Sequence, residues 1–183
     1  MSDSPSFGQF ALRVTACQVV TYFVAGLGAF AFLDYRGQFL SQALSCFMLP
    51  VDAPIVALGP ILQVFRGLIF AAALFPFRQV FLATPRGWLL LWGLMVGLAV
   101  LSPTGPAPAS VEGFIYTKVP ISQQVLGYFE VLPQTLAFSF LVVAWNRRPS
   151  RAWTIVMVGL TVIVGLMSVL GYLAATGRIP RSS

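Results

Sequence analysis

An arginine and a glutamate lie inside two long apolar stretches of the chain. Arg66 falls within the stretch 55–75, and Glu130 falls within the stretch 121–145. A charged side chain at the depth of a lipid bilayer is costly unless it meets a partner or water. Opposite charges that are buried together offset this cost, and removing one partner destabilises a protein by about 3–5 kcal/mol. The sequence therefore predicts an Arg66–Glu130 ion pair inside a membrane.

Glutamines accompany both charged residues at helical spacing. Residues three and four positions apart share one face of a helix. Lipid offers such side chains no hydrogen-bond partner, so both polar faces are expected to turn towards the interior of a helical bundle. The polar intramembrane site that this pattern predicts consists of Arg66, Glu130, Gln63, Gln123 and Gln134.

Two roles are open for this site. Intramembrane charges often mark a pathway for a substrate or an ion, in which Arg66 would attract anions. Alternatively, the charged pair fixes the register of two helices and has no further role. A third polar face, formed by Gln18 and Tyr22 in the stretch 10–33, is expected to turn inwards as well.

Several catalytic chemistries lack the residues that they require. The chain contains no histidine, which excludes His-ligated haem and serine–histidine catalysis. Its single lysine, Lys118, lies outside the apolar stretches. Asp52, Glu112 and Tyr116 are candidates for chemistry at the outer face, but no further ligand-spaced residues accompany them. We therefore expect a non-enzymatic protein without a metal or organic cofactor, and a membrane enzyme acting at the outer face is the least favoured alternative.

The composition is typical of an integral membrane protein. Of the 183 residues, 58% are hydrophobic and 9% are charged, whereas soluble domains carry about 25% charged residues. Mean hydropathy is +0.87. A soluble fold of this length has too little interior to bury so much apolar surface. Lipid must therefore supply part of the surroundings, and bound membrane lipids are expected.

Five apolar stretches are each near the roughly 20 residues that cross a bilayer. They cover residues 10–33, 55–75, 87–101, 121–145 and 153–175, and 87–101 is the shortest. We predict a single transmembrane helical domain over residues 1–183, an all-α integral membrane protein with a bundle of about five transmembrane helices and structured outer loops. Gly93 and Gly97 form a GxxxG pattern, which indicates a face on which helices approach closely.

Basic residues indicate how this bundle is oriented. Loops rich in arginine and lysine stay in the cytoplasm, so the N-terminus is expected inside and the C-terminus outside a bacterial inner membrane. The net charge of +6 comes from basic residues at the ends of the apolar stretches, where membrane topology requires them. Nucleic acid is therefore not an expected partner. The expected cytoplasmic side holds Arg13, Arg78, Arg86, Arg147, Arg148 and Arg151, and the outer side holds Arg36, Lys118, Arg178 and Arg181. Five of these cytoplasmic residues form a basic face that is suited to binding anionic lipid headgroups. They are Arg78, Arg86, Arg147, Arg148 and Arg151.

Two segments on the expected outer side are unusually apolar. Leu40, Leu44 and Met48 have the spacing of an amphipathic helix on the membrane surface, within residues 34–54. The segment 102–120 begins with a part rich in proline and glycine that cannot form a regular helix. Its second half is apolar, so the segment is either a re-entrant or interfacial cap over the bundle or an ordinary loop.

The two cysteines are expected to be free thiols. A disulfide requires Cα atoms within about 7 Å of each other. Cys17 lies near the start of the first apolar stretch, and Cys46 lies beyond its far end. The length of that stretch keeps them apart.

The leading functional expectation is an oligomeric channel or transport-type membrane protein built around the polar site. The chain is small for a solitary transporter, so a homo-oligomer or a subunit of a larger membrane complex is expected. The alternative function is an accessory or scaffold subunit, in which the charged pair serves assembly alone. No residue pattern identifies a substrate.

Overall fold

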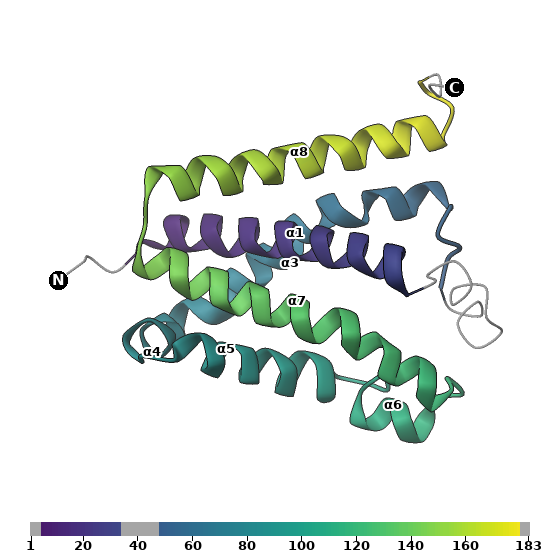
Figure 1. The fold of residues 1–183 in the computed structure, drawn as a ribbon, viewed down its shortest axis with the longest axis horizontal. Helices are drawn as coiled ribbons and strands as arrows, with labels where there is room; N and C mark the ends of the chain where they lie inside the picture. The colour runs from purple at the N-terminus through teal and green to yellow at the C-terminus, as the bar shows by residue number, and fades with distance from the viewer. Residues whose placement is uncertain (1–4, 34–47, 180–183) are drawn as a thin grey trace.

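The computed structural model describes residues 5–33 and 48–179, and every regular element within these ranges is a helix (Figure 1). Five segments run alternately between the two ends of a bundle. They are α1 (Phe7–Phe32), Pro54–Ala83, Gly87–Leu101, α7 (Ile121–Arg147) and α8 (Arg151–Ala175). Four of them are long and apolar enough to cross a membrane, and Gly87–Leu101 is apolar but shorter. The predicted all-helical bundle is confirmed, and its insertion into a membrane stays a prediction.

The second segment consists of several short helices in a row. A 3-10 turn, η1 (Pro54–Leu58), leads into α3 (Gly59–Leu74), and another, η2 (Phe75–Phe77), leads into α4 (Arg78–Ala83). Pro60 and Pro76 each occupy the first turn of an element. Proline has no N–H to donate, so it is tolerated at a helix start and interrupts a continuous helix. The prolines divide the segment into short helices. The last of them, α4, ends at Ala83, beyond the predicted span 55–75.

The third segment continues without a break. α5 (Gly87–Met95) passes directly into a π-helical stretch, η3 (Val96–Leu101). Together they cover the predicted span 87–101. A wider helical turn of this kind often marks a functional position.

The central helix of the bundle is α1. Helices α3, α7 and α8 pack on α1, whereas α5 packs on α7 (Figure 1). Ser6 fixes the start of α1, because its side chain accepts a hydrogen bond from the Gln9 N–H while the Gln9 side chain accepts one from the Ser6 N–H. Such a capping box satisfies two N–H groups that a helix start leaves without partners.

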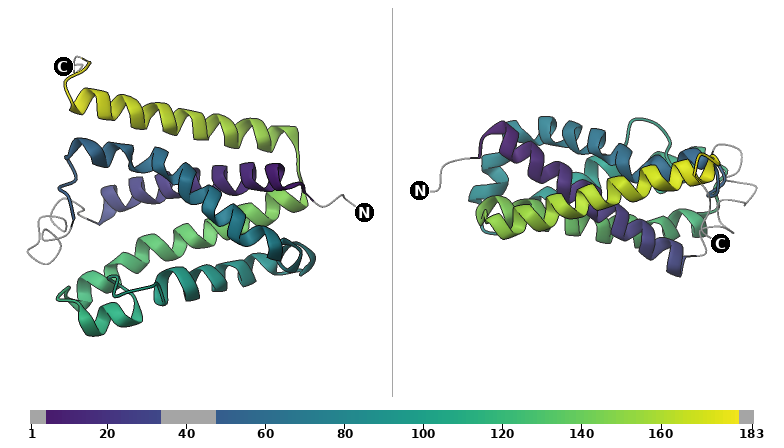
Figure 2. Two further views of the ribbon diagram at one scale, coloured as in Figure 1. Left: turned by 180° about the vertical axis from the view of Figure 1, so that it is seen from behind. Right: turned by 90° about the horizontal axis from the view of Figure 1, so that it is seen from above.

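The hydrophobic core occupies the end of the bundle at which α1 begins. Phe10, Val14, Phe138 and Trp145 are each at most 2% exposed there, and they form one cluster with side chains of α3, α4, α5 and α8. Cys17, a free and fully buried thiol, belongs to the same cluster, whereas Cys46 lies outside the described residues. Towards the other end, α3 and α5 diverge (Figure 2). The buried core cluster thus lies in one half of the bundle.

A glycine permits the close contact between α1 and α3. A Cβ atom at Gly67 would lie 2.6 Å from the Cα atom of Thr15. Small residues let helix backbones approach each other this closely. Because Arg66 precedes this glycine, the contact also fixes where Arg66 leaves α3.

The predicted GxxxG face does not serve packing within the described chain. A Cβ atom at Gly93 of α5 or at Gly97 of η3 would meet no atom within 4 Å. Small residues of α8 do pack. A Cβ atom at Gly165 would lie 2.9 Å from Ile61 Cδ1, and the Ser168 hydroxyl donates to the Ala57 carbonyl.

The apolar outer segments are partly described. The predicted surface helix within 34–54 lies mostly outside the described residues, and residues 48–53 form turns. Residues 102–110 contain no helix, as predicted, and α6 (Val111–Tyr116) follows them. Ser110 caps α6 by accepting a hydrogen bond from the Gly113 N–H. The segment 102–120 is thus an ordered structure at the end of the bundle, and its membrane depth stays a prediction.

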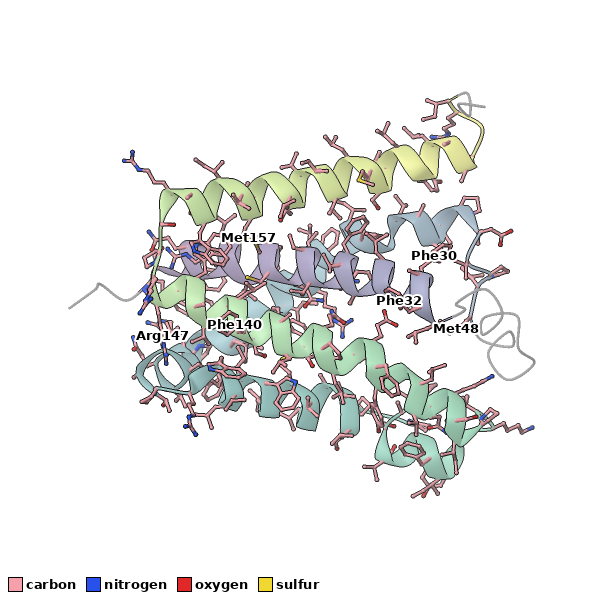
Figure 3. The ribbon with its side chains drawn as sticks, viewed as in Figure 1. Phe30, Phe32, Met48, Phe140, Arg147 and Met157 are labelled. Atoms are coloured by element: carbon pink, nitrogen blue, oxygen red, sulfur yellow. The ribbon has the colours of Figure 1, made fainter. Side chains whose placement is uncertain are left out.

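Arg147 does not belong to a free basic face, contrary to the prediction. Its guanidinium donates to four carbonyl oxygens between residues 81 and 85, at the end of α4 and in the turn that follows (Figure 3). The last carbonyls of a helix have no partner within the helix. Arg147 supplies these partners and ties the α4–α5 turn to the end of α7.

Arg78 is also bound within the protein. Its guanidinium lies 3.9 Å from the centre of the Phe75 ring, and it donates to the Phe75 carbonyl. Arg86, Arg148 and Arg151 are exposed. Of the predicted basic face, these three residues have exposed side chains, and their contact with lipid stays a prediction.

Gly67→Ala is expected to destabilise the protein by about 1–3 kcal/mol, because its methyl group would force α1 and α3 apart. The measurement is the apparent melting temperature of the purified protein in detergent. Gly93→Ala is the matched control, since it adds the same methyl group where a Cβ atom has no neighbour within 4 Å. That variant should be neutral or slightly more stable, because alanine favours a helix over glycine. Equal melting temperatures for the two variants would contradict the close contact.

Candidate functional site

A cavity lies in the half of the bundle away from the hydrophobic core. It encloses about 380 Å³ and is lined by α1, α3, α5, η3, α7 and the loop 103–109. Phe70 of α3 and Phe138 of α7 form its floor, with ring centroids 5.8 Å apart. Small-molecule sites have volumes of about 300–1,000 Å³. The cavity is therefore large enough for a small ligand.

The structure brings four of the five predicted site residues to this cavity. Arg66 lines it from α3, and Gln123, Glu130 and Gln134 line it from one face of α7. Both helices pack on α1, so the two charged side chains enter the same space. Their direct ion pair stays a prediction.

The fifth predicted residue, Gln63, binds to α1. Its Oε1 accepts a hydrogen bond of 3.0 Å from Nε2 of Gln18, which is 2% exposed. Gln18 and Tyr22 both line the cavity, as expected of an inward-facing polar stripe. The Tyr22 hydroxyl lies within electrostatic reach of both Arg66 and Glu130. The polar stripe of α1 thus lies between the positive and the negative side of the site.

One cavity residue carries an unused hydrogen-bond acceptor. Oε1 of Gln123 is buried and finds no donor within the described protein. A buried polar atom without a partner costs about 1–3 kcal/mol. This oxygen is therefore suited to a ligand that brings an N–H or O–H group.

The loop over the cavity is fastened to α7 by residues that the sequence analysis missed. Gln124 is 2% exposed, and its Oε1 accepts from the Ala109 N–H at 3.0 Å while its Nε2 donates to the Val119 carbonyl at 2.8 Å. The Tyr128 hydroxyl donates to the Ala109 carbonyl. These two residues are one helical turn apart, beside the recognised stripe of α7. This spacing of one helical turn was the signal in the sequence that could have identified them.

Ala109 has an uncommon backbone conformation. Its φ of 69° lies in the left-handed region, which costs residues other than glycine about 1–2 kcal/mol. Such a conformation persists only where the surroundings hold it. Here α7 binds both its N–H and its carbonyl. The loop wall of the cavity is therefore held in one position.

Glu130 also borders a second cavity. This apolar groove lies between α1 and α7 and is lined by Ala29, Phe129, Glu130 and Pro133 among others. Pro133 lies inside α7 and cannot donate to the Phe129 carbonyl one turn before it. α7 continues through Pro133 but lacks one backbone hydrogen bond next to the carboxylate, which borders cavities on two sides of the α1–α7 contact.

The candidates for chemistry at the outer face are not brought together. Asp52 precedes η1, which packs on α8, whereas Glu112 and Tyr116 belong to α6 on the other side of the bundle (Figure 1). All three side chains are exposed. They do not form a shared site.

No protein family model, curated protein or solved structure matches this chain. The function must therefore be argued from the chemistry of the cavity. That cavity offers a cation, a carboxylate, several amides and an aromatic floor.

Tyr128→Phe is expected to release the loop 103–109, because the strained Ala109 loses one of its two bonds to α7. The measurement is amide hydrogen exchange of this loop, which should become faster by roughly tenfold, as the loss of one hydrogen bond implies. Tyr116→Phe is the control, since that hydroxyl lies on an exposed side chain of α6. Equal exchange in both variants would show that Tyr128 does not hold the loop.

Proposed function

We propose that this protein spans the membrane five times and transports a polar ligand through the cavity between α3 and α7, without catalysing a reaction. The observation that carries the proposal is the location of Arg66, Glu130 and four glutamines around one cavity in an otherwise apolar bundle. Charged groups are retained inside a membrane mainly where they meet each other, water or a substrate. A purely structural pair would need no space around it.

The second cavity supports transport rather than binding alone. Glu130 borders both the polar cavity and the apolar groove behind it, close to Pro133, where α7 lacks one backbone hydrogen bond. A transported ligand must be reachable from each side of the membrane in turn, and a carboxylate that borders two cavities suits this requirement. The packed core at the other end would close the pathway in the described state.

We place the end that bears Arg86, Arg148 and Arg151 in the cytoplasm of a bacterial cell. Basic loops remain on that side, and these exposed arginines lie near the start of α1, α5 and α8. The C-terminus and the half of the bundle that contains the cavity then face outwards. An oligomeric assembly in the inner membrane remains part of this proposal.

A cysteine at position 134 tests the pathway. Gln134→Cys in a Cys46→Ser background places a thiol in the cavity wall, while the native Cys17 is fully buried and should not react. A charged, membrane-impermeant thiol reagent should label it in intact cells and also in inverted vesicles, because a transporter opens to both sides. Ser150→Cys in the same background reports sidedness and should be labelled only in inverted vesicles.

Ala137→Cys is the matched control, since this exposed position on α7 does not line the cavity and would face lipid. It should resist the charged reagent in membranes. Labelling of Gln134→Cys from the outside alone would contradict transport. Absence of labelling from either side would contradict an aqueous cavity.

A second candidate function is that of an accessory subunit in a larger membrane complex. It is favoured by α5, which packs on α7 but leaves Gly93 and Gly97 without a neighbour. Close-packing faces of this kind suit a helix from another chain. Native mass spectrometry after mild detergent extraction should then show unrelated membrane proteins bound at fixed stoichiometry. A single copy or a homo-oligomer would contradict this role.

A further inference from the structure

The cavity is open on one side of the bundle. α3 and α5 line opposite walls, but among the described helices they do not pack on each other, since α3 packs on α1 and α5 packs on α7. Seen from behind, the two helices converge at α4 and diverge towards the end that carries α6 (Figure 2). Arg66 lines the cavity and yet is exposed. At Arg66 the cavity therefore reaches the surface of the bundle, where lipid would surround it.

The cavity lining has an apolar part and a charged part. Phe70, Met95, Ala99 and Val100 supply the apolar surface on α3, α5 and η3. Glu130 and the amides of Gln123 and Gln134 line the cavity from α7. A ligand that fits both environments has a polar head and an apolar remainder. It can place its head in the cavity while its hydrocarbon part stays in the bilayer.

The polar groups also indicate the chemistry of that head. The guanidinium of Arg66 matches a phosphate, which it can bind with two parallel hydrogen bonds. Glu130 matches a cation. The unused Oε1 of Gln123 requires a donor, and a primary ammonium has three N–H groups to offer. One positive and one negative residue in the same cavity match a head that carries both charges.

We propose that the cavity binds the headgroup of a phospholipid that carries a phosphate and a primary ammonium, with its acyl chains leaving between α3 and α5. This inference rests on the proposed transport function and names its substrate class. Arg66 holds the phosphate, and Glu130 and Gln123 accept hydrogen bonds from the ammonium. A trimethylammonium head lacks N–H donors, and a glycerol head lacks the cation, so both should bind less well.

Competition between lipids tests the proposal. The purified full chain is reconstituted with equal amounts of dioleoyl phosphatidylethanolamine, phosphatidylcholine and phosphatidylglycerol, and the lipids retained after mild detergent extraction are measured by native mass spectrometry. Phosphatidylethanolamine should exceed each of the others by roughly tenfold, as the loss of one charge-assisted hydrogen bond implies. Equal retention of phosphatidylethanolamine and phosphatidylcholine, or a preference for phosphatidylglycerol, would overturn the proposal.

Three variants separate the roles of the cavity residues. Arg66→Leu should lower the retention of phosphatidylethanolamine and phosphatidylcholine alike. Glu130→Gln should reduce the preference for phosphatidylethanolamine over phosphatidylcholine, and Glu112→Gln on the exposed surface of α6 should not change it. Gln123→Leu should reduce the preference without lowering the melting temperature, because the oxygen it removes has no partner in the described protein. An unchanged preference in both Glu130→Gln and Gln123→Leu would overturn the assignment.

Two further results distinguish the alternatives. Glycerophosphoethanolamine has the same head without acyl chains, and it should not displace the lipid at equal concentration. Displacement would show that the ligand is a free solute. Labelling of Gln134→Cys does not depend on the lipid. Two-sided labelling without lipid preference would therefore defeat this substrate class alone, whereas lipid preference with one-sided labelling would defeat transport alone.

Discussion

The contact between α1 and α3 at Thr15 and Gly67 is the constraint on which the cavity depends. The backbones meet there because position 67 has no side chain. On one side of this contact, aromatic and aliphatic side chains fill the bundle. On the other side, α3 and α5 diverge (Figure 2) and both line the cavity. Arg66 lies next to the contact, so its guanidinium emerges where packing ends.

The polar residues of the hollow half support one another across several helices. Gln63 of α3 binds Gln18 of α1, and Gln124 and Tyr128 of α7 bind the loop at Ala109. In an apolar environment a polar group without a partner is costly, so a site of this kind must be supported by further polar residues. Gln123 is the exception, since its buried Oε1 finds no donor in the described protein. That exception indicates ligand chemistry most directly.

Hydropathy was sufficient to predict the bundle. Residues at the bilayer depth must be apolar and must form complete hydrogen-bonded helices, so the five stretches appear directly in the sequence. Helical spacing also placed Arg66, Glu130, Gln123 and Gln134 on inward faces, and the structure brings them to one cavity. Whether the two charges pair directly stays a prediction.

Other features depend on contacts between distant segments, which periodicity does not encode. The left-handed conformation of Ala109 depends on Gln124 and Tyr128. The carbonyls that bind Arg147 become available only because α4 ends beside α7. The GxxxG pattern predicted packing, but a Cβ atom at either glycine would meet no atom within 4 Å. A spacing rule identifies a face, and the fold decides what that face meets.

The attachment of the α4–α5 turn by Arg147 has a consequence for how the bundle can move. Its guanidinium joins this turn to the end of α7 through carbonyls of several residues. The connection from α3 through α4 to α5 is therefore fixed at this corner of the bundle. If the gap between α3 and α5 widens or narrows, the corner must act as a pivot, and the largest displacement must occur at the α6 end. Such a movement is thereby confined to the half of the bundle that carries α6, while the arginine-bearing end remains closed.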